Sequence, residues 1–175
     1  YRGAQHHARL LQHLPDAEVF LVGRCDANLA AALQADADPS RLHIDGIGHY
    51  VPHERIVDYY LRERWTAGLA LFPPNRHTLH KELTKLFEYM ALGIPVLASN
   101  FPLWREIVEE AQCGQVADPT KSGDVFQAAR EVLETQGQGE KGYRAVHERY
   151  SWQSESQRLL KFVDDVLAHR ALAGD

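Results

Sequence analysis

The sequence predicts an α/β fold in which a parallel sheet is flanked by helices. Apolar runs of strand length alternate with segments of helical periodicity along the whole chain. Glycine or proline residues follow three of these runs, which marks them as separate strands. Strands that are separated by helices lie parallel to one another. The length of 175 residues suits one domain with a full core.

The first half of the chain contains three expected strands and three expected helices. The strands are expected at residues 18–22, 41–47 and 67–72, and the helices at residues 3–14, 26–35 and 52–64. Pro15 ends the first helix, and Asp26 can cap the second. Gly23 closes the first strand, and Gly48 follows the second. A loop at residues 73–82 begins with two prolines.

The second half continues the alternation. The strands are expected at residues 94–99 and 114–117, and the helices at residues 83–91, 103–110, 122–135 and 140–173. Gly93 lies at the position of a C-terminal cap, just after the helix at 83–91. Ser122 or Asp124 is expected to open the helix at 122–135, and residues 137–142 form a polar break. The last helix is expected to divide at residues 150–151, where Ser151 can cap its second part.

Composition and charge exclude several classes of partner. The net charge of −5 and the absence of a basic run argue against binding of nucleic acid. The apolar stretches have the length of strands, far below the ~20 residues of a membrane span. Cys25 and Cys113 are far apart and lack metal-ligand spacing, so we expect free thiols in a reducing compartment.

One pair of charged residues predicts a functional site. Lys85 is placed in the first turn of the helix at 83–91, where the helix dipole disfavours a cation unless a bound anion offsets its charge. Glu88 follows three residues later on the same side of that helix. The loops at 46–53, 73–82 and 99–104 follow strands and are expected at the same edge of the sheet, where ligands of such folds bind. We therefore expect a phosphate site at this edge.

The same residues resemble a known family. KLFEYMALGIPVLAS (85–99), followed by Glu106, resembles the donor-binding signature of the group-1 (family 4) glycosyltransferases. VPHERIVDYY (51–60) and AGLALF (67–72) are similar to the segment before that signature, and YSWQSESQRLL (150–160) to the closing helix of the domain. The family has the GT-B fold, which consists of two Rossmann-like domains facing a cleft.

The resemblance implies that this chain is the C-terminal half of a GT-B fold. Residues 1–150 would form the nucleotide-sugar-binding Rossmann-like domain, and residues 151–175 its closing helix. By the same resemblance, we expect the first strand of the sheet and the N-terminal GT-B domain to precede Tyr1.

The resemblance also implies roles for individual residues. Arg2 and Lys85 would stabilise the diphosphate during catalysis, and Glu88 would bind the ribose hydroxyls. The remaining donor-binding positions are Val51 at the nucleobase, the backbone of Leu83 and Thr84 at the distal phosphate, and His80. His80 departs from the family pattern, which often has a glutamate eight positions before the residue that Glu88 matches.

The implied function is transfer of a sugar by a retaining-type hexosyltransferase. The donor would be a nucleoside-diphosphate-sugar such as a UDP-sugar, and the acceptor a sugar or lipid-linked hydroxyl in bacterial surface-polysaccharide biosynthesis. We expect no metal and no other cofactor, and a cytoplasmic location at the inner face of the membrane through the preceding domain. Two alternatives stay open: a GT-B sugar-nucleotide epimerase, and a GT-B-like partner or binding module without catalytic activity.

Overall fold

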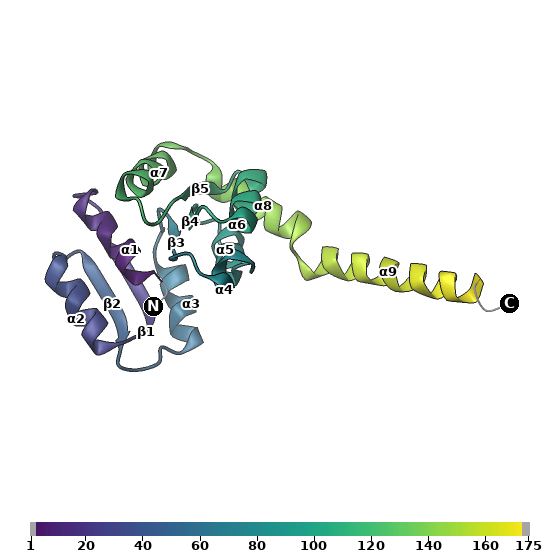
Figure 1. Cartoon of the computed structure of the whole chain (residues 1–175), viewed down its shortest axis with the longest axis horizontal. Helices are drawn as coiled ribbons and strands as arrows, with labels where there is room; N and C mark the ends of the chain where they lie inside the picture. Colours follow the sequence, from purple (N-terminus) through teal and green to yellow (C-terminus); the bar gives the residue numbers. More distant parts are fainter. Residues whose placement is uncertain (1–2, 173–175) are drawn as a thin grey trace.

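Residues 3–172 are described here from a computed structural model (Figure 1). The strands are β1 (Val19–Cys25), β2 (Leu42–Ile47), β3 (Gly68–Ala70), β4 (Val96–Ser99) and β5 (Gly114–Ala117). The helices before β4 are α1 (Ala4–Arg9), the 3-10 turn η1 (Leu10–Gln12), α2 (Ala27–Asp36), α3 (His53–Arg62), α4 (Arg76–Leu79) and α5 (Thr84–Ala91). The helices after β4 are α6 (Pro102–Ala111), α7 (Ser122–Glu134), α8 (Gln138–Arg149) and α9 (Trp152–Leu172).

Every pair of hydrogen-bonded strands is parallel, which confirms the predicted fold class. Among the described residues the strands form two sheets, ordered β1-β2 and β3-β4-β5, where the alternation of helices and strands predicted a single sheet. Other groups satisfy the backbone of β3 where a neighbouring strand would pair. Nε2 of His7 accepts a hydrogen bond from the Leu71 N–H at 3.0 Å, and the Tyr89 hydroxyl donates to the Leu69 carbonyl at 3.3 Å.

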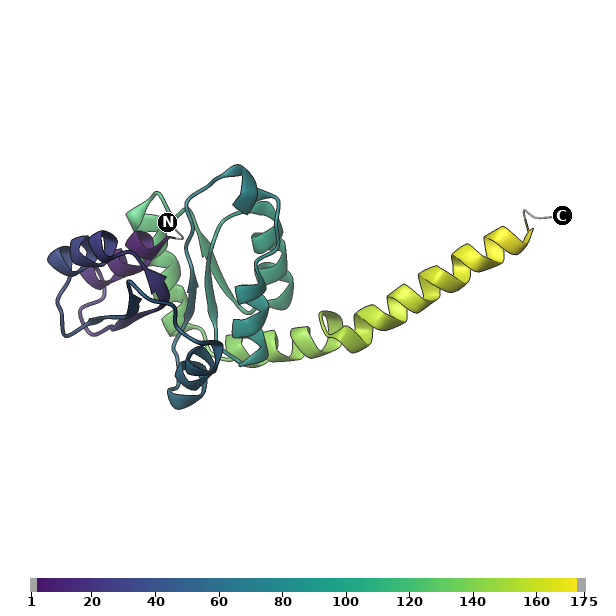
Figure 2. The same cartoon turned by 90° about the horizontal axis from the view of Figure 1, so that it is seen from below.

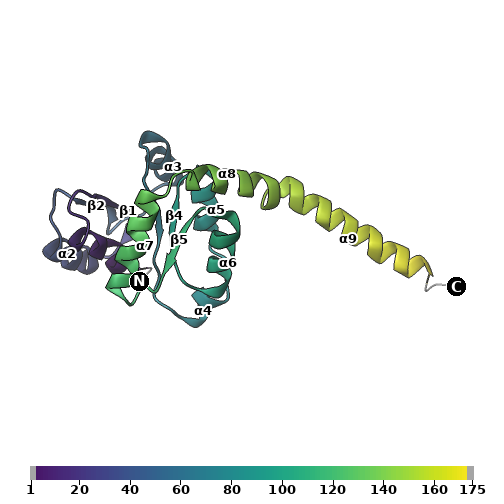
Figure 3. The same ribbon diagram turned by 90° about the horizontal axis from the view of Figure 1, so that it is seen from above.

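The larger sheet lies between two layers of helix. Figures 2 and 3 show α7 on one face of β3-β4-β5 and α5 and α6 on the other. All four residues of β4 are buried, as expected for a strand that is covered on both faces. α1 and α2 pack against β1 and β2, where Ala8, Leu11, Val19, Leu33 and Leu42 form a separate apolar cluster.

The C-terminal end of α5 is built as the sequence predicts. Gly93 has a φ of 66°, which favours glycine, and its N–H donates to the Met90 carbonyl at 3.0 Å. The N–H of Ile94 donates to the Tyr89 carbonyl at 2.9 Å, which completes a Schellman motif. This turn joins α5 to β4 and so fixes the position of α5 on the sheet.

Several element boundaries differ from the predictions. β1 continues through Gly23, whose φ of 138° accommodates a register shift between Val22 and Cys25. The 73–82 loop contains α4, because Asn75 and Thr78 form a reciprocal capping box. The N-cap of α7 is Lys121, whereas Ser122 or Asp124 was predicted to open this helix.

The predicted polar break at 137–142 is the start of α8. Its glycines permit close packing instead of ending the helix. A Cβ on Gly139 would lie 1.9 Å from the Gly93 carbonyl oxygen, and one on Gly142 would lie 3.0 Å from the Cys113 Cβ. α8 can therefore approach α5 and β5 only because these positions lack side chains.

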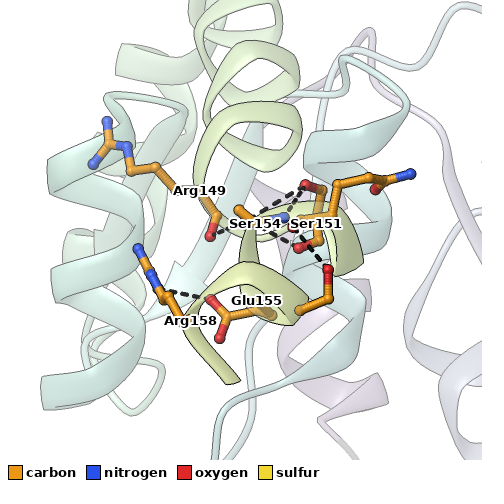
Figure 4. A network of polar contacts seen from close by, with 7 residues as sticks. Arg149, Ser151, Ser154, Glu155 and Arg158 are labelled. Atoms are coloured by element: carbon orange, nitrogen blue, oxygen red, sulfur yellow. Dashed lines mark hydrogen bonds and ion pairs between the residues drawn. The ribbon is translucent and has the colours of Figure 1, made fainter. Parts of the chain in front are cut away.

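The predicted division at residues 150–151 is confirmed. Ser151 accepts a hydrogen bond from the Ser154 N–H at 3.3 Å, as an N-cap does (Figure 4). The hydroxyl of Ser154 also donates to the Arg149 carbonyl, and Arg158 pairs with Glu155 at 2.7 Å. From this turn α9 projects away from the rest of the molecule (Figure 1).

α9 carries several exposed apolar side chains. They are Trp152, Leu159, Leu160, Phe162, Val163, Val166 and Leu167. No helix within residues 3–172 combines the length and the apolar character that crossing a bilayer requires.

Candidate functional site at the start of α5

The first turn of α5 leaves backbone donors without partners. Leu83 is the N-cap, and its side chain cannot accept a hydrogen bond, so no side chain caps this helix. Within residues 3–172, the N–H groups of Thr84 and Lys85 donate to no backbone or side-chain acceptor. These donors and the dipole of the helix make its start favourable for an anion.

Lys85 lies in this first turn, as the sequence predicts. Its side chain is half-buried, and Nζ lies 5.8 Å from the centre of the Tyr89 ring. Among residues 3–169 no carboxylate forms an ion pair with it. The positive charge of Lys85 is therefore available to an incoming anion.

His7 is a buried neutral group near Lys85. Burial, followed by the charges of His6 and Lys85, lowers the pKa of His7 to about 3. The neutral ring accepts the Leu71 N–H through Nε2. His7 therefore holds β3 in place without adding a second positive charge beside Lys85.

A buried tryptophan holds the loop that leads into α5. The indole N–H of Trp104 on α6 donates to the Lys81 carbonyl at 2.7 Å. The ring is 1% exposed and contacts Phe72 and Phe101 in edge-to-face arrangements, with centroid distances of 5.5 and 4.8 Å. The start of α5 is thus anchored to the core of the larger sheet.

Glu88 lies one turn further along α5 and is half-buried. The hydroxyl of Tyr60 on α3 donates to Oε2 of Glu88 at 3.2 Å. Burial and the nearby carboxylate raise the pKa of Tyr60, so the phenol keeps the proton that it donates. The sequence alone did not predict this contact, since 28 residues separate the two positions.

The other predicted positions are placed differently. Val51 is 1% exposed at the start of α3 and packs against Gly46, where a Cβ would lie 2.6 Å from the Val51 methyl carbon Cγ2. His80 is exposed at the C-terminal end of α4, and within residues 3–172 its side chain makes no hydrogen bond or ion pair. Arg2 lies outside the described residues.

Metal ligands do not gather in the described part of the chain. Within it, no group of three or more His, Cys, Asp or Glu side chains is arranged to hold a metal ion. The features that converge near the start of α5 are instead backbone N–H groups, an unpaired lysine and a carboxylate held by a tyrosine. This combination suits a ligand that carries both phosphate and hydroxyl groups.

Comparison with known families gives a direct assignment. Residues 5–149 match the family described as "Glycosyl transferases group 1". The chain belongs to this family. The match includes β1 to β5 and α5, so the assignment covers the elements that build the candidate site.

A solved structure supports the fold of this group 1 glycosyl transferase. It is the 1.35 Å crystal structure of the C-terminal domain of a glycosyl transferase group 1 family protein (LpcC) from Francisella tularensis. The TM-score is 0.63 at 20% sequence identity, and the alignment covers 86% of this chain and 80% of that chain. The group 1 glycosyl transferase thus resembles the C-terminal domain of a GT-B enzyme in fold. A comparison with curated protein sequences gave no match.

Proposed function

We propose that this chain is the donor-binding domain of a retaining-type hexosyltransferase that uses a nucleoside-diphosphate-sugar, such as a UDP-sugar. The observation that carries the proposal is the uncapped start of α5 with Lys85 in its first turn. A diphosphate leaving group develops negative charge as the bond to the sugar breaks. Free N–H groups and an unpaired ammonium at one helix start are suited to stabilise that charge.

Four residues are assigned to the phosphates. The backbone N–H groups of Leu83 and Thr84 would bind the distal phosphate, and Lys85 would approach the leaving oxygen. Loss of one such contact in an enzyme typically costs about 3 kcal/mol, which is a rate factor of ~100 or more. Arg2 is proposed as a second cation on the diphosphate.

The rest of the donor is assigned to side chains around Glu88. The Glu88 carboxylate accepts hydrogen bonds, as binding of two ribose hydroxyls requires. Val51 lies at the start of α3 and is proposed to contact the nucleobase through its main chain. His80 is proposed to lie near the donor sugar, where its exposed ring would be free to turn toward the ligand.

The acceptor and the cellular setting are broader proposals. We propose that the acceptor is a sugar or lipid-linked hydroxyl in bacterial surface-polysaccharide biosynthesis. A preceding N-terminal GT-B domain would bind it and complete the cleft, at the cytoplasmic face of the membrane. The family assignment to glycosyl transferases supports a transfer reaction over the epimerase and over the binding module.

Titration calorimetry on the full-length protein tests the donor assignment. We expect UDP or GDP to bind, and Glu88→Ala to raise the dissociation constant by about 5- to 150-fold, the equivalent of ~1–3 kcal/mol. Glu109→Ala is the control, because Glu109 is an exposed glutamate on α6. Unchanged affinity in Glu88→Ala would remove the ribose assignment. Binding without any sugar transfer would favour the non-catalytic module instead.

A further inference from the structure

Glu88 is held by a side chain from a different helix. The Tyr60 hydroxyl donates to Oε2 of Glu88 across the interface between α3 and α5. The Tyr60 ring also meets the Tyr89 ring edge to face, with centroids 6.0 Å apart and an interplanar angle of 85°. Tyr89 in turn packs over Gly68, where a Cβ would lie 2.3 Å from the ring. The phenol is therefore held by packing against β3 and α5.

We propose that Tyr60 is a positioning residue that orients the Glu88 carboxylate toward the ribose of the donor nucleotide. This inference rests on the proposed function, in which Glu88 binds the ribose. It assigns to Tyr60 no contact with the ligand. Its role is to restrict the rotation of Glu88 so that the carboxylate is in place before the nucleotide arrives.

The hydrogen-bonding capacity of a carboxylate permits this role. An ionised carboxylate has two oxygens with about four acceptor positions between them. The Tyr60 hydroxyl occupies one position, on Oε2, and leaves Oε1 and the remaining lone pair on Oε2. A ribose presents two neighbouring hydroxyl donors, which the remaining positions can accept together.

The location of Tyr60 connects two parts of the proposed site. α3 begins directly after the segment that contains Val51, which is assigned to the nucleobase, and Tyr60 lies near the other end of the same helix. One helix therefore carries the nucleobase segment and the group that holds the ribose carboxylate. A shift of α3 would move both together.

The neighbouring Tyr59 offers a matched control. Its hydroxyl donates to Asp45 at 3.0 Å, and Asp45 also accepts a 2.6 Å hydrogen bond from Arg55. The Tyr59 bond thus joins α3 to β2 instead of to α5. Tyr59→Phe and Tyr60→Phe remove the same hydroxyl from adjacent positions of one helix, and each keeps its ring.

The test compares a ribose with a sugar that lacks its hydroxyls. Calorimetry on the full-length protein would use UDP or GDP, whichever binds more tightly, and the 2′,3′-dideoxy form of the same nucleotide. We expect Tyr60→Phe to weaken binding of the ribose form by about 3- to 10-fold, within the range for the net contribution of one neutral hydrogen bond. The dideoxy form should bind equally to the wild type and to Tyr60→Phe. Tyr59→Phe should change neither affinity.

Three results would overturn the inference, and they are distinguishable. Equal losses with both nucleotides would mean that Tyr60 only supports the fold. A second result is that Tyr60→Phe binds the ribose form as tightly as the wild type does, while the wild type still prefers the ribose form to the dideoxy form. This result would remove the role of Tyr60 and leave the proposed function intact. A wild type with no preference for the ribose form would remove the assignment of Glu88, and the inference about Tyr60 would fall with it.

A double variant provides a second measurement. Tyr60→Phe should have no further effect on ribose binding once Glu88→Ala has removed the carboxylate, because both changes act on one interaction. Additive losses in the double variant would contradict the proposed coupling. Far-ultraviolet circular dichroism of each variant shows whether the fold is retained.

Discussion

Trp104 on α6 donates a 2.7 Å hydrogen bond to the carbonyl of Lys81, two residues before the N-cap of α5. The start of α5, which is the proposed anion site, is therefore positioned by a side chain that comes later in the chain and is itself 1% exposed. The precision of the proposed phosphate site depends on this contact, because the residues between α4 and α5 form no regular structure of their own.

Trp104→Phe should destabilise the protein by about 2–3 kcal/mol. The change leaves the Lys81 carbonyl without its donor and leaves space in the core. Urea unfolding followed by circular dichroism measures this. Trp152→Phe is the control, since Trp152 is 73% exposed, and its effect should stay within about 0.5 kcal/mol. Equal effects of the two substitutions would contradict the anchoring role of Trp104.

Lys85→Ala should lower the turnover number of the full-length enzyme by about 100-fold or more, with a smaller effect on donor affinity. In the proposed role, the contact of Lys85 with the leaving oxygen strengthens as charge develops there, so it would contribute mainly in the transition state. Lys85→Arg should restore only part of the rate, because a planar fork replaces a compact charge. Steady-state kinetics decide this, with the exposed Lys161→Ala as control. Loss of affinity at unchanged turnover would make Lys85 a simple binding residue.

Gly93→Ala should destabilise the protein by about 1 kcal/mol or more. Its φ of 66° is strained for any residue with a side chain, and the Schellman motif depends on it. Gly123→Ala is the control, because a Cβ there would meet no atom within 4 Å, in the first turn of α7. That substitution should be neutral or stabilise by up to about 1 kcal/mol. The comparison uses urea unfolding, and a neutral Gly93→Ala would contradict the assigned turn.

His7 should make stability depend on pH in mild acid. Burial lowers the pKa of His7 from its ordinary value of 6.5 to about 3 in the folded chain, so between these values the unfolded chain binds the extra proton. The contribution of His7 to the free energy of unfolding is therefore fully present above about pH 6.5. It decreases toward pH 3 with a slope of about 1.4 kcal/mol per pH unit. Urea unfolding at pH 6.5 and pH 5 measures this loss in the wild type.

His7→Gln should flatten this acid loss. A glutamine can still accept the Leu71 N–H, but it does not titrate. The exposed His53→Gln on α3 is the control and should keep the dependence of the wild type. An identical loss of stability in His7→Gln and the wild type would exclude His7 as its source.

Local patterns were enough to predict the helices and strands that surround α5. The apolar periodicity of residues 83–91, Gly93 and the buried run of β4 are local signals, and each predicted its element. Lys85 in a first helical turn is likewise a local signal, because the helix dipole acts over one turn. Asn75 and Thr78 carried an equally local capping signal for α4, which the prediction of an irregular loop overlooked.

The sequence by itself determined the α/β class, the cap that joins α5 to β4, the division at Ser151 and the first-turn position of Lys85. These depend on backbone preferences and on side chains only a few residues apart. Tertiary structure alone decided the split into two sheets, the close approach of α8 through Gly139 and Gly142, and the bonds from Trp104 to Lys81 and from Tyr60 to Glu88. Those contacts join segments that are distant in the chain, so they exist only once packing has brought their helices and strands together.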